Sequence, residues 1–112
     1  MKPVLHPSER RTVEALASRL RQEFSNTLLE VRLYGSKARG DASPESDIDI
    51  LAVFSRAPSP EQEDNVRNFL YDLDLENGTV TQLLIVEEEW WDSPVTKVTL
   101  FRREVLEQGV AL

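Results

Sequence analysis

Two aspartates stand one residue apart at the start of the most apolar stretch of this sequence, DIDILAVF at residues 47–54. Side chains in a strand alternate between its two faces, so Asp47 and Asp49 point the same way. The isoleucines that follow each of them point the other way, into the core. Two carboxylates this close repel each other and raise each other's pKa. A divalent cation relieves that repulsion, and Mg²⁺ favours one or two carboxylates combined with phosphate oxygens.

An earlier apolar run, LLEVRLYG at residues 28–35, ends at Gly35, and Ser36 follows it. They mark the point where a strand meets the short helical turn predicted for SKARG. Glycine lets the backbone approach a ligand closely, and free N–H groups at a helix start, together with a serine hydroxyl, suit a phosphate. The segment therefore predicts anion binding at one end and metal binding at the other, which together describe a site for a metal-bound nucleoside triphosphate. For Lys37 and Arg39, contact with phosphate and plain surface charge are equally open.

Helical and strand patterns alternate around this segment. Apolar residues at three- and four-residue steps predict helices. Ser59, Pro60 and Gln62 have the residue types that open a capped helix, and Gly78 follows its end. The predicted helices cover residues 8–25, 60–77 and 94–108, and the predicted strands cover 28–35, 47–54 and 79–86. This order predicts an α/β (α+β) fold with a small mixed β-sheet and helices packed mainly on one face.

Composition narrows the class of protein. A length of 112 residues suggests one domain over residues 1–112. The absence of cysteine excludes disulfides and thiolate metal sites. No stretch approaches the roughly 18 apolar residues of a membrane helix, and the N-terminus lacks the apolar run of a signal peptide, so we expect a cytoplasmic protein without a membrane partner. A net charge of −7 argues against broad capture of a nucleic-acid backbone.

The spacing of the two motifs resembles that of a known protein superfamily. Gly-Ser, ten residues and then Asp-x-Asp, at residues 35–49, is the signature of the DNA polymerase β-like nucleotidyltransferase superfamily. GSKARGDASPESDIDI resembles in particular the minimal nucleotidyltransferases, which are short prokaryotic chains without a substrate domain. The resemblance extends from the first predicted helix to the last, and it implies the nucleotidyltransferase fold.

The resemblance also implies roles for single residues. Gly35 and Ser36 would hold the terminal phosphates of a nucleoside triphosphate, with ATP expected. Asp47 and Asp49 would be the catalytic and metal-binding residues, holding Mg²⁺ (or Mn²⁺) and orienting the α-phosphate for attack by a hydroxyl. Arg39 matches a basic position common in the family and would contact phosphate.

This sequence departs from the family pattern at one position. Members usually carry a third carboxylate on a later strand, where it completes the metal site and takes the proton from the attacking hydroxyl. The corresponding strand here, TVTQLLIV, has no acid, and Gln82 stands about where the acid belongs. An amide cannot take the proton. Asp72, Asp74 and Glu87 are nearby in the sequence, and Asp74 is the most plausible substitute.

Two functional hypotheses follow from the resemblance. Minimal nucleotidyltransferases often pair with a HEPN-type protein as antitoxin and toxin, so the first is an antitoxin that transfers AMP from ATP to a hydroxyl of its partner protein. The second is a catalytically impaired binding module that neutralises its partner by contact alone, as the missing acid at Gln82 suggests. Transfer to a small molecule such as an aminoglycoside is a weaker alternative, and the sequence leaves self-association open.

Overall fold

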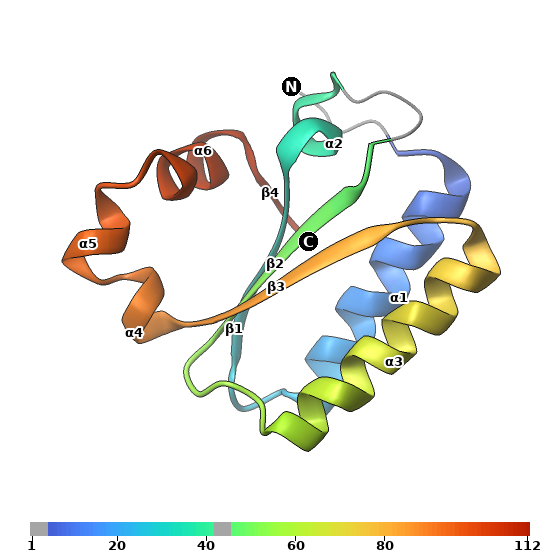
Figure 1. The fold of residues 1–112 in the computed structure, drawn as a ribbon, viewed down its shortest axis with the longest axis horizontal. Helices are drawn as coiled ribbons and strands as arrows, with labels where there is room; N and C mark the ends of the chain where they lie inside the picture. The colour runs from blue at the N-terminus through green and yellow to red at the C-terminus, as the bar shows by residue number, and fades with distance from the viewer. Residues whose placement is uncertain (1–4, 42–45) are drawn as a thin grey trace.

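The computed structural model of this chain describes residues 5–41 and 46–112. Helices and strands alternate along most of its length (Figure 1). None of the described helices is both long and apolar enough to cross a bilayer. In chain order the elements are α1 (Pro7–Glu23), β1 (Leu28–Tyr34), α2 (Gly35–Arg39), β2 (Ile48–Phe54), α3 (Pro60–Asn77), β3 (Thr81–Glu87), α4 (Glu88–Trp91), α5 (Pro94–Lys97), α6 (Leu100–Gln108) and β4 (Val110–Ala111).

The strands form one mixed sheet in the order β3-β2-β1-β4. β1 pairs antiparallel with β2 and with β4, whereas β2 and β3 run parallel. A parallel pair needs a long crossover connection, and α3 supplies it. The register places Asp49 between Tyr34 on β1 and Gln82 on β3. The mixed sheet predicted from the sequence is confirmed, and the short strand β4 is an addition to it.

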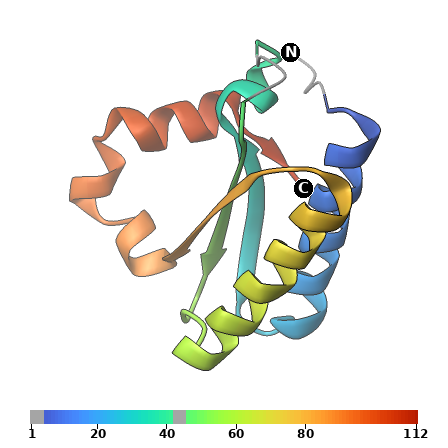
Figure 2. The ribbon, with the colours of Figure 1, turned by 45° about the vertical axis from the view of Figure 1, so that its right-hand side comes forward.

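The two long helices, α1 and α3, lie together on one face of the sheet (Figures 1 and 2). The core between them and the sheet is closed, because Leu20 of α1, Val66 of α3 and Ile50 of β2 are each 0% exposed. Burying an aliphatic side chain of this size contributes about 1.5–3 kcal/mol. The predicted caps of α3 are also present: the Ser59 hydroxyl accepts a hydrogen bond from the Gln62 N–H, and Gly78 ends the helix with a positive φ.

The three short helices α4, α5 and α6 lie on the opposite side of the sheet from α1 and α3 (Figures 1 and 2). They cover only part of that face, where Leu51 and Val53 of β2 pack in one cluster with Trp91 and Val105. By strand alternation this is the face that carries Asp49. Apolar packing therefore covers this face at Leu51 and Val53, toward the end of β2, whereas Asp49 lies on the same face near the start of the strand.

The prediction of a single helix over residues 94–108 is wrong, because this segment forms two helices, α5 and α6. The hydroxyl of Ser93 accepts a hydrogen bond from the Thr96 N–H, and that of Thr99 accepts one from the Arg102 N–H. Thr99 also donates its hydroxyl to the Thr96 carbonyl at 2.7 Å. These bonds offer the backbone an alternative to a continuous helix, so each short helix receives its own N-cap.

Lys37 forms a buried ion pair, which neither of its two predicted roles included. Its side chain is 3% exposed, and the ammonium nitrogen lies 2.6 Å from the carboxylate of Glu9 at the start of α1. Glu9 also accepts a hydrogen bond from the His6 backbone N–H at 2.9 Å. Burial alone would raise the pKa of Glu9, but the hydrogen bonds from Lys37 and His6 outweigh it and lower that pKa. The pair joins α2, and with it Gly35, to α1.

Breaking this pair should destabilise the fold in a pH-dependent way. Glu9→Gln leaves the Lys37 ammonium buried without its counter-charge, so we expect a loss of about 3 kcal/mol in the free energy of unfolding at pH 7. The folded-state pKa of Glu9 lies below its ordinary value of 4.5. Its contribution is therefore present above that value and is lost as the pH falls through the folded-state pKa.

Urea unfolding at a series of pH values measures this effect. The gap in stability between wild type and Glu9→Gln should shrink as the pH falls below 4.5. Glu14→Gln, at an exposed position of the same helix, is the matched control and should change stability little. A similar loss in both variants, or a gap that does not change with pH, would contradict the role given to the pair.

Candidate active site

Asp47 and Asp49 lie at the start of β2, on the face of the sheet that α4, α5 and α6 cover only in part. Asp47 directly precedes β2 and Asp49 is its second residue. Both side chains are partly exposed, whereas Ile48 is 1% and Ile50 0% exposed in the core on the other face. The predicted alternation is therefore confirmed at all four positions. The apolar residues behind the carboxylates fix the strand, so that both acids face the same region.

Gly35 brings the start of α2 against Asp49. Its φ is +76°, and a Cβ atom added to it would lie 2.4 Å from the Oδ2 atom of Asp49. A side chain at position 35 would therefore strain the backbone and push the Asp49 carboxylate aside. Ser36 follows directly as the second residue of α2. The structure thus brings together the two halves of the sequence motif, which are separated by ten residues in the chain.

The electrostatics of this end of the sheet favour a cation. Burial and then the charge of Asp47 raise the pKa of Asp49, and Arg39 opposes them only in part. On the neighbouring strand, burial and the charge of Asp49 raise the pKa of Tyr34. Tyr34 was not among the predicted site residues, because only the register of β1 with β2 places it beside Asp49. Burial and the charge of Asp47 thus disfavour the ionised form of Asp49, and a bound cation would relieve this.

Gln82, for which the resemblance predicts the place of a third acid, lies beside both aspartates. It is the register partner of Asp49 on β3, and its Nε2 atom donates a hydrogen bond to the Oδ2 atom of Asp47 at 3.2 Å. Asp74 does not replace the missing acid, because its carboxylate oxygens accept hydrogen bonds from the Thr79 hydroxyl and from the N–H and hydroxyl of Thr81. Those bonds fix the turn between α3 and β3.

Asp47 and Asp49 could hold Mg²⁺ only if oxygen atoms of a bound molecule or of water supplied the remaining metal ligands. Within residues 5–41 and 46–112, no group of three or more histidine, cysteine, aspartate or glutamate side chains could enclose a metal ion. Two carboxylates on one face, with further ligands from phosphate oxygens and water, are nevertheless the usual protein share of a Mg²⁺–nucleotide site. Asp47 and Asp49 match that share.

Arg39 lies at the end of α2 and pairs with Asp41, with its Nε atom 3.2 Å from the Oδ2 atom. The side chains of the two residues are 38% and 62% exposed, so this is a surface ion pair that contributes little to stability. A depression of about 570 Å³ adjoins Arg39, with lining residues from α2 and from the end of α6. The guanidinium is therefore available to an anionic ligand. Ser43 and Glu45, for which the sequence predicts a loop, lie outside the described residues.

A methyl group at position 35 should displace the Asp49 carboxylate. Gly35→Ala adds both backbone strain and the clash with Asp49, so we expect it to cost about 2–4 kcal/mol in unfolding free energy. Gly78→Ala is the matched control, because Gly78 has a φ of +66° and nothing within 4 Å of an added Cβ. Its cost should be limited to the strain, about 1–2 kcal/mol.

Urea unfolding of the two variants isolates the cost of the clash, because their difference removes the strain that they share. Amide chemical shifts should change around Asp49 in Gly35→Ala and remain unchanged there in Gly78→Ala. Equal destabilisation in the two variants would show that the close approach of Gly35 to Asp49 is not a constraint on the site.

Comparison with known proteins now places this geometry in a family. Residues 13–111 match the nucleotidyltransferase domain. The chain is 30% identical over 105 residues to the "Putative protein adenylyltransferase" of Methanocaldococcus jannaschii, covering 94% of this chain and 98% of that protein. It is 29% identical over 109 residues to a "Bifunctional uridylyltransferase/uridylyl-removing enzyme" of Burkholderia mallei. That match covers 93% of this chain but 13% of the larger enzyme.

Solved structures agree on the fold. A "putative minimal nucleotidyltransferase" superposes with a TM-score of 0.62 at 25% identity, covering 92% of this chain and 91% of the other. The structure described as "toxin-antitoxin with AMP-PNP" superposes with a TM-score of 0.57 at 19% identity, covering 88% and 70%, and at that identity it speaks for the fold alone. With the Gly-Ser and Asp-x-Asp motifs joined at one end of its sheet, this chain belongs to the nucleotidyltransferase domain family.

Proposed function

We propose that this protein transfers AMP from ATP to a hydroxyl group of a partner protein, with Mg²⁺ bound at Asp47 and Asp49. The observation that carries the proposal is the contact between the start of α2 and Asp49, which sets a phosphate-binding turn beside a carboxylate pair. The match to an archaeal protein described as an adenylyltransferase of proteins supports both the nucleotide and the class of acceptor. We further propose that residues 1–112 work as a single minimal domain in the cytoplasm.

The residues of the site have separate tasks in this proposal. The backbone N–H groups at Gly35 and Ser36, with the Ser36 hydroxyl, hold the terminal phosphates, and Arg39 adds a positive charge to them. Asp47 and Asp49 hold the metal and thereby fix the position of the α-phosphate. When bound, Mg²⁺ would offset the charge of the triphosphate and polarise the α-phosphorus. Gln82 holds Asp47 in place through its amide.

The transfer forms a bond between the acceptor oxygen and the α-phosphorus, and it breaks the bond from that phosphorus to pyrophosphate, which leaves. The hydroxyl proton has no carboxylate at position 82 to receive it, so we propose that it leaves to solvent. The rate acceleration in such a site comes mainly from positioning of the reactants and from electrostatic stabilisation of the transition state, rather than from proton transfer. Slow turnover is therefore part of the proposal.

The proposed acceptor is a toxin, and specifically a HEPN-type protein. The support for a toxin is the likeness of fold to chains described as toxin–antitoxin structures, one of them with AMP-PNP. The HEPN type is what the resemblance to the minimal nucleotidyltransferases implies. In this proposal the chain is the antitoxin, and addition of AMP silences the partner. The acceptor hydroxyl would enter over the uncovered part of the sheet, beside Asp49 and Gln82.

Calorimetric titration of ATP, with and without Mg²⁺, tests the nucleotide site. We expect measurable binding with Mg²⁺ and binding weaker by at least about tenfold without it, because Asp47 and Asp49 repel the bare triphosphate. Asp47→Asn should abolish the Mg²⁺ dependence. Asp72→Asn, at an exposed position of α3, removes the same charge elsewhere and should bind ATP like wild type.

Two results would count against the site. One is ATP binding that Mg²⁺ does not affect. The other is equal weakening by Asp47→Asn and Asp72→Asn, because a loss that depends only on net charge would place no ligand at Asp47.

A second candidate function is favoured by Gln82: a module that binds nucleotide and neutralises its partner by contact, without transfer. The comparison of Gln82→Asp with Gln82→Asn separates the two functions, because the variants have the same shape and differ in the carboxylate. Release of pyrophosphate from Mg²⁺–ATP, with water as the acceptor, is measured for each. A general base contributes about 10²–10⁴-fold to a rate, so a silent wild type should gain activity only in Gln82→Asp. Transfer by the wild type itself would end this second candidate.

A further inference from the structure

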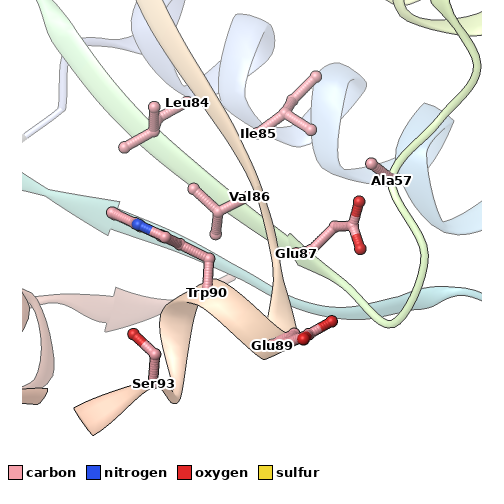
Figure 3. Close-up of a pocket in the computed structure, with 8 residues that line it drawn as sticks. All are labelled: Ala57, Leu84, Ile85, Val86, Glu87, Glu89, Trp90 and Ser93. Atoms are coloured by element: carbon pink, nitrogen blue, oxygen red, sulfur yellow. The ribbon is translucent and has the colours of Figure 1, made fainter. Parts of the chain in front are cut away.

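An open groove follows the outer edge of the sheet, away from the carboxylates. It has a volume of about 700 Å³ and is lined mainly by the second half of β3 and by α4. β3 is the last strand of the sheet, and the described residues place no further strand beside it. Figure 3 shows the groove side chains, with Val86 between the indole of Trp90 and the carboxylate of Glu87.

The backbone of β3 reveals which of its residues face this groove. The Val80 carbonyl accepts a hydrogen bond from the N–H of Ile48 on β2. Since successive residues of a strand direct their backbone groups to opposite sides, the odd-numbered residues of β3 face the outer edge. The Leu83 carbonyl agrees with this, because it accepts a hydrogen bond from the Arg67 guanidinium of α3 at 3.1 Å. Past Leu83, Ile85 presents its N–H and C=O to the groove.

The side chains of the groove differ between the two faces of β3. On the face shared with Asp49 they are apolar and exposed: Leu84 is 37% and Trp90 51% exposed. On the other face lies Glu87, and Glu89 of α4 adds a second carboxylate. No lysine or arginine is among the described residues that line the groove. An extended segment with apolar side chains on one face and basic side chains on the other would match this arrangement, since strand addition pairs both backbone and alternating side chains.

We propose that this groove is a docking site for an extended segment of a partner protein that carries alternating apolar and basic residues, added to the edge of β3 beyond Arg67. The apolar side chains cover Leu84 and Trp90, and the basic side chains pair with Glu87 and Glu89. Docking requires neither ATP nor metal, so the proposal goes beyond nucleotide transfer. The groove nonetheless lies near the proposed site, because Leu84 and Gln82 share a face two residues apart on β3, about 7 Å.

The probes are short synthetic peptides added to the whole protein without ATP or metal. One alternates leucine and arginine, and a second alternates leucine and glutamate. A third has the side chains of the first but methyl groups on the amide nitrogens that would pair with β3. Amide chemical shifts locate the binding, and tryptophan fluorescence gives the affinity, because Trp90 is exposed whereas Trp91 is 3% exposed.

We expect the leucine–arginine peptide to shift the amides of residues 84–90 and the other two peptides to bind at least about tenfold more weakly. The double variant Glu87→Lys and Glu89→Lys should weaken the first peptide by at least about tenfold. Its matched control is Asp72→Lys with Glu76→Lys, two exposed positions on α3, which changes the net charge equally and should leave most of the affinity. Trp90→Ala should also weaken binding.

Four results would overturn the proposal. They are shifts centred outside residues 84–90, undiminished binding of the methylated peptide, equal weakening by the two charge-reversed pairs, and no binding of the leucine–arginine peptide. Sedimentation tests the other occupant of a strand edge, a second copy of this chain. A stable dimer that Trp90→Ala dissociates would assign the groove to self-association and would also reject the partner segment.

Discussion

The site depends on one close approach, that of the Gly35 backbone to the carboxylate of Asp49. A Cβ atom at position 35 would overlap the Asp49 carboxylate and would strain a backbone with a φ of +76°, so glycine lets the start of α2 come this close without moving Asp49. Two other features hold the approach in place. Gly40 ends α2 in the left-handed conformation after a single short helix, and the buried pair of Lys37 with Glu9 fixes α2 to α1. The ion pair is therefore structural, although it lies beside the proposed phosphate turn.

The two faces of the sheet explain why the site is at one end. α1 and α3 close one face along its length, and their core holds Ile48 and Ile50 rigidly. On the other face, α4, α5 and α6 pack over Leu51 and Val53, and Tyr34, the neighbour of Asp49 on β1, packs against the same cluster. The same strand thus has apolar contacts on both faces at one end and charged groups on one face at the other. The burial of β2 keeps two mutually repelling acids in position, and binding of a cation would then relieve the repulsion.

The sequence was most informative where a local pattern has a local physical cause. Alternation in DIDILAVF placed the two aspartates on one face, and the capping residues Ser59 and Gln62 marked the start of α3. The register between neighbouring strands is harder to predict from the sequence. Nothing in a single strand shows that Tyr34 and Gln82 flank Asp49, because that depends on how three strands align. Lys37 was ambiguous because its partner Glu9 lies 28 residues earlier, and Thr99 gave no periodic signal that it begins a separate helix.

We propose that Asp47 and Asp49, together with the Gly35–Ser36 turn, hold a metal-bound triphosphate. Broadening of backbone amide signals by Mn²⁺ in the presence of ATP measures this binding, because the paramagnetic effect falls steeply with distance from the ion. The amides of Gly35, Ser36 and Asp49 should broaden at the lowest Mn²⁺ concentrations. Broadening centred on the acidic residues of α4, or none at the start of β2, would show that the ion binds elsewhere.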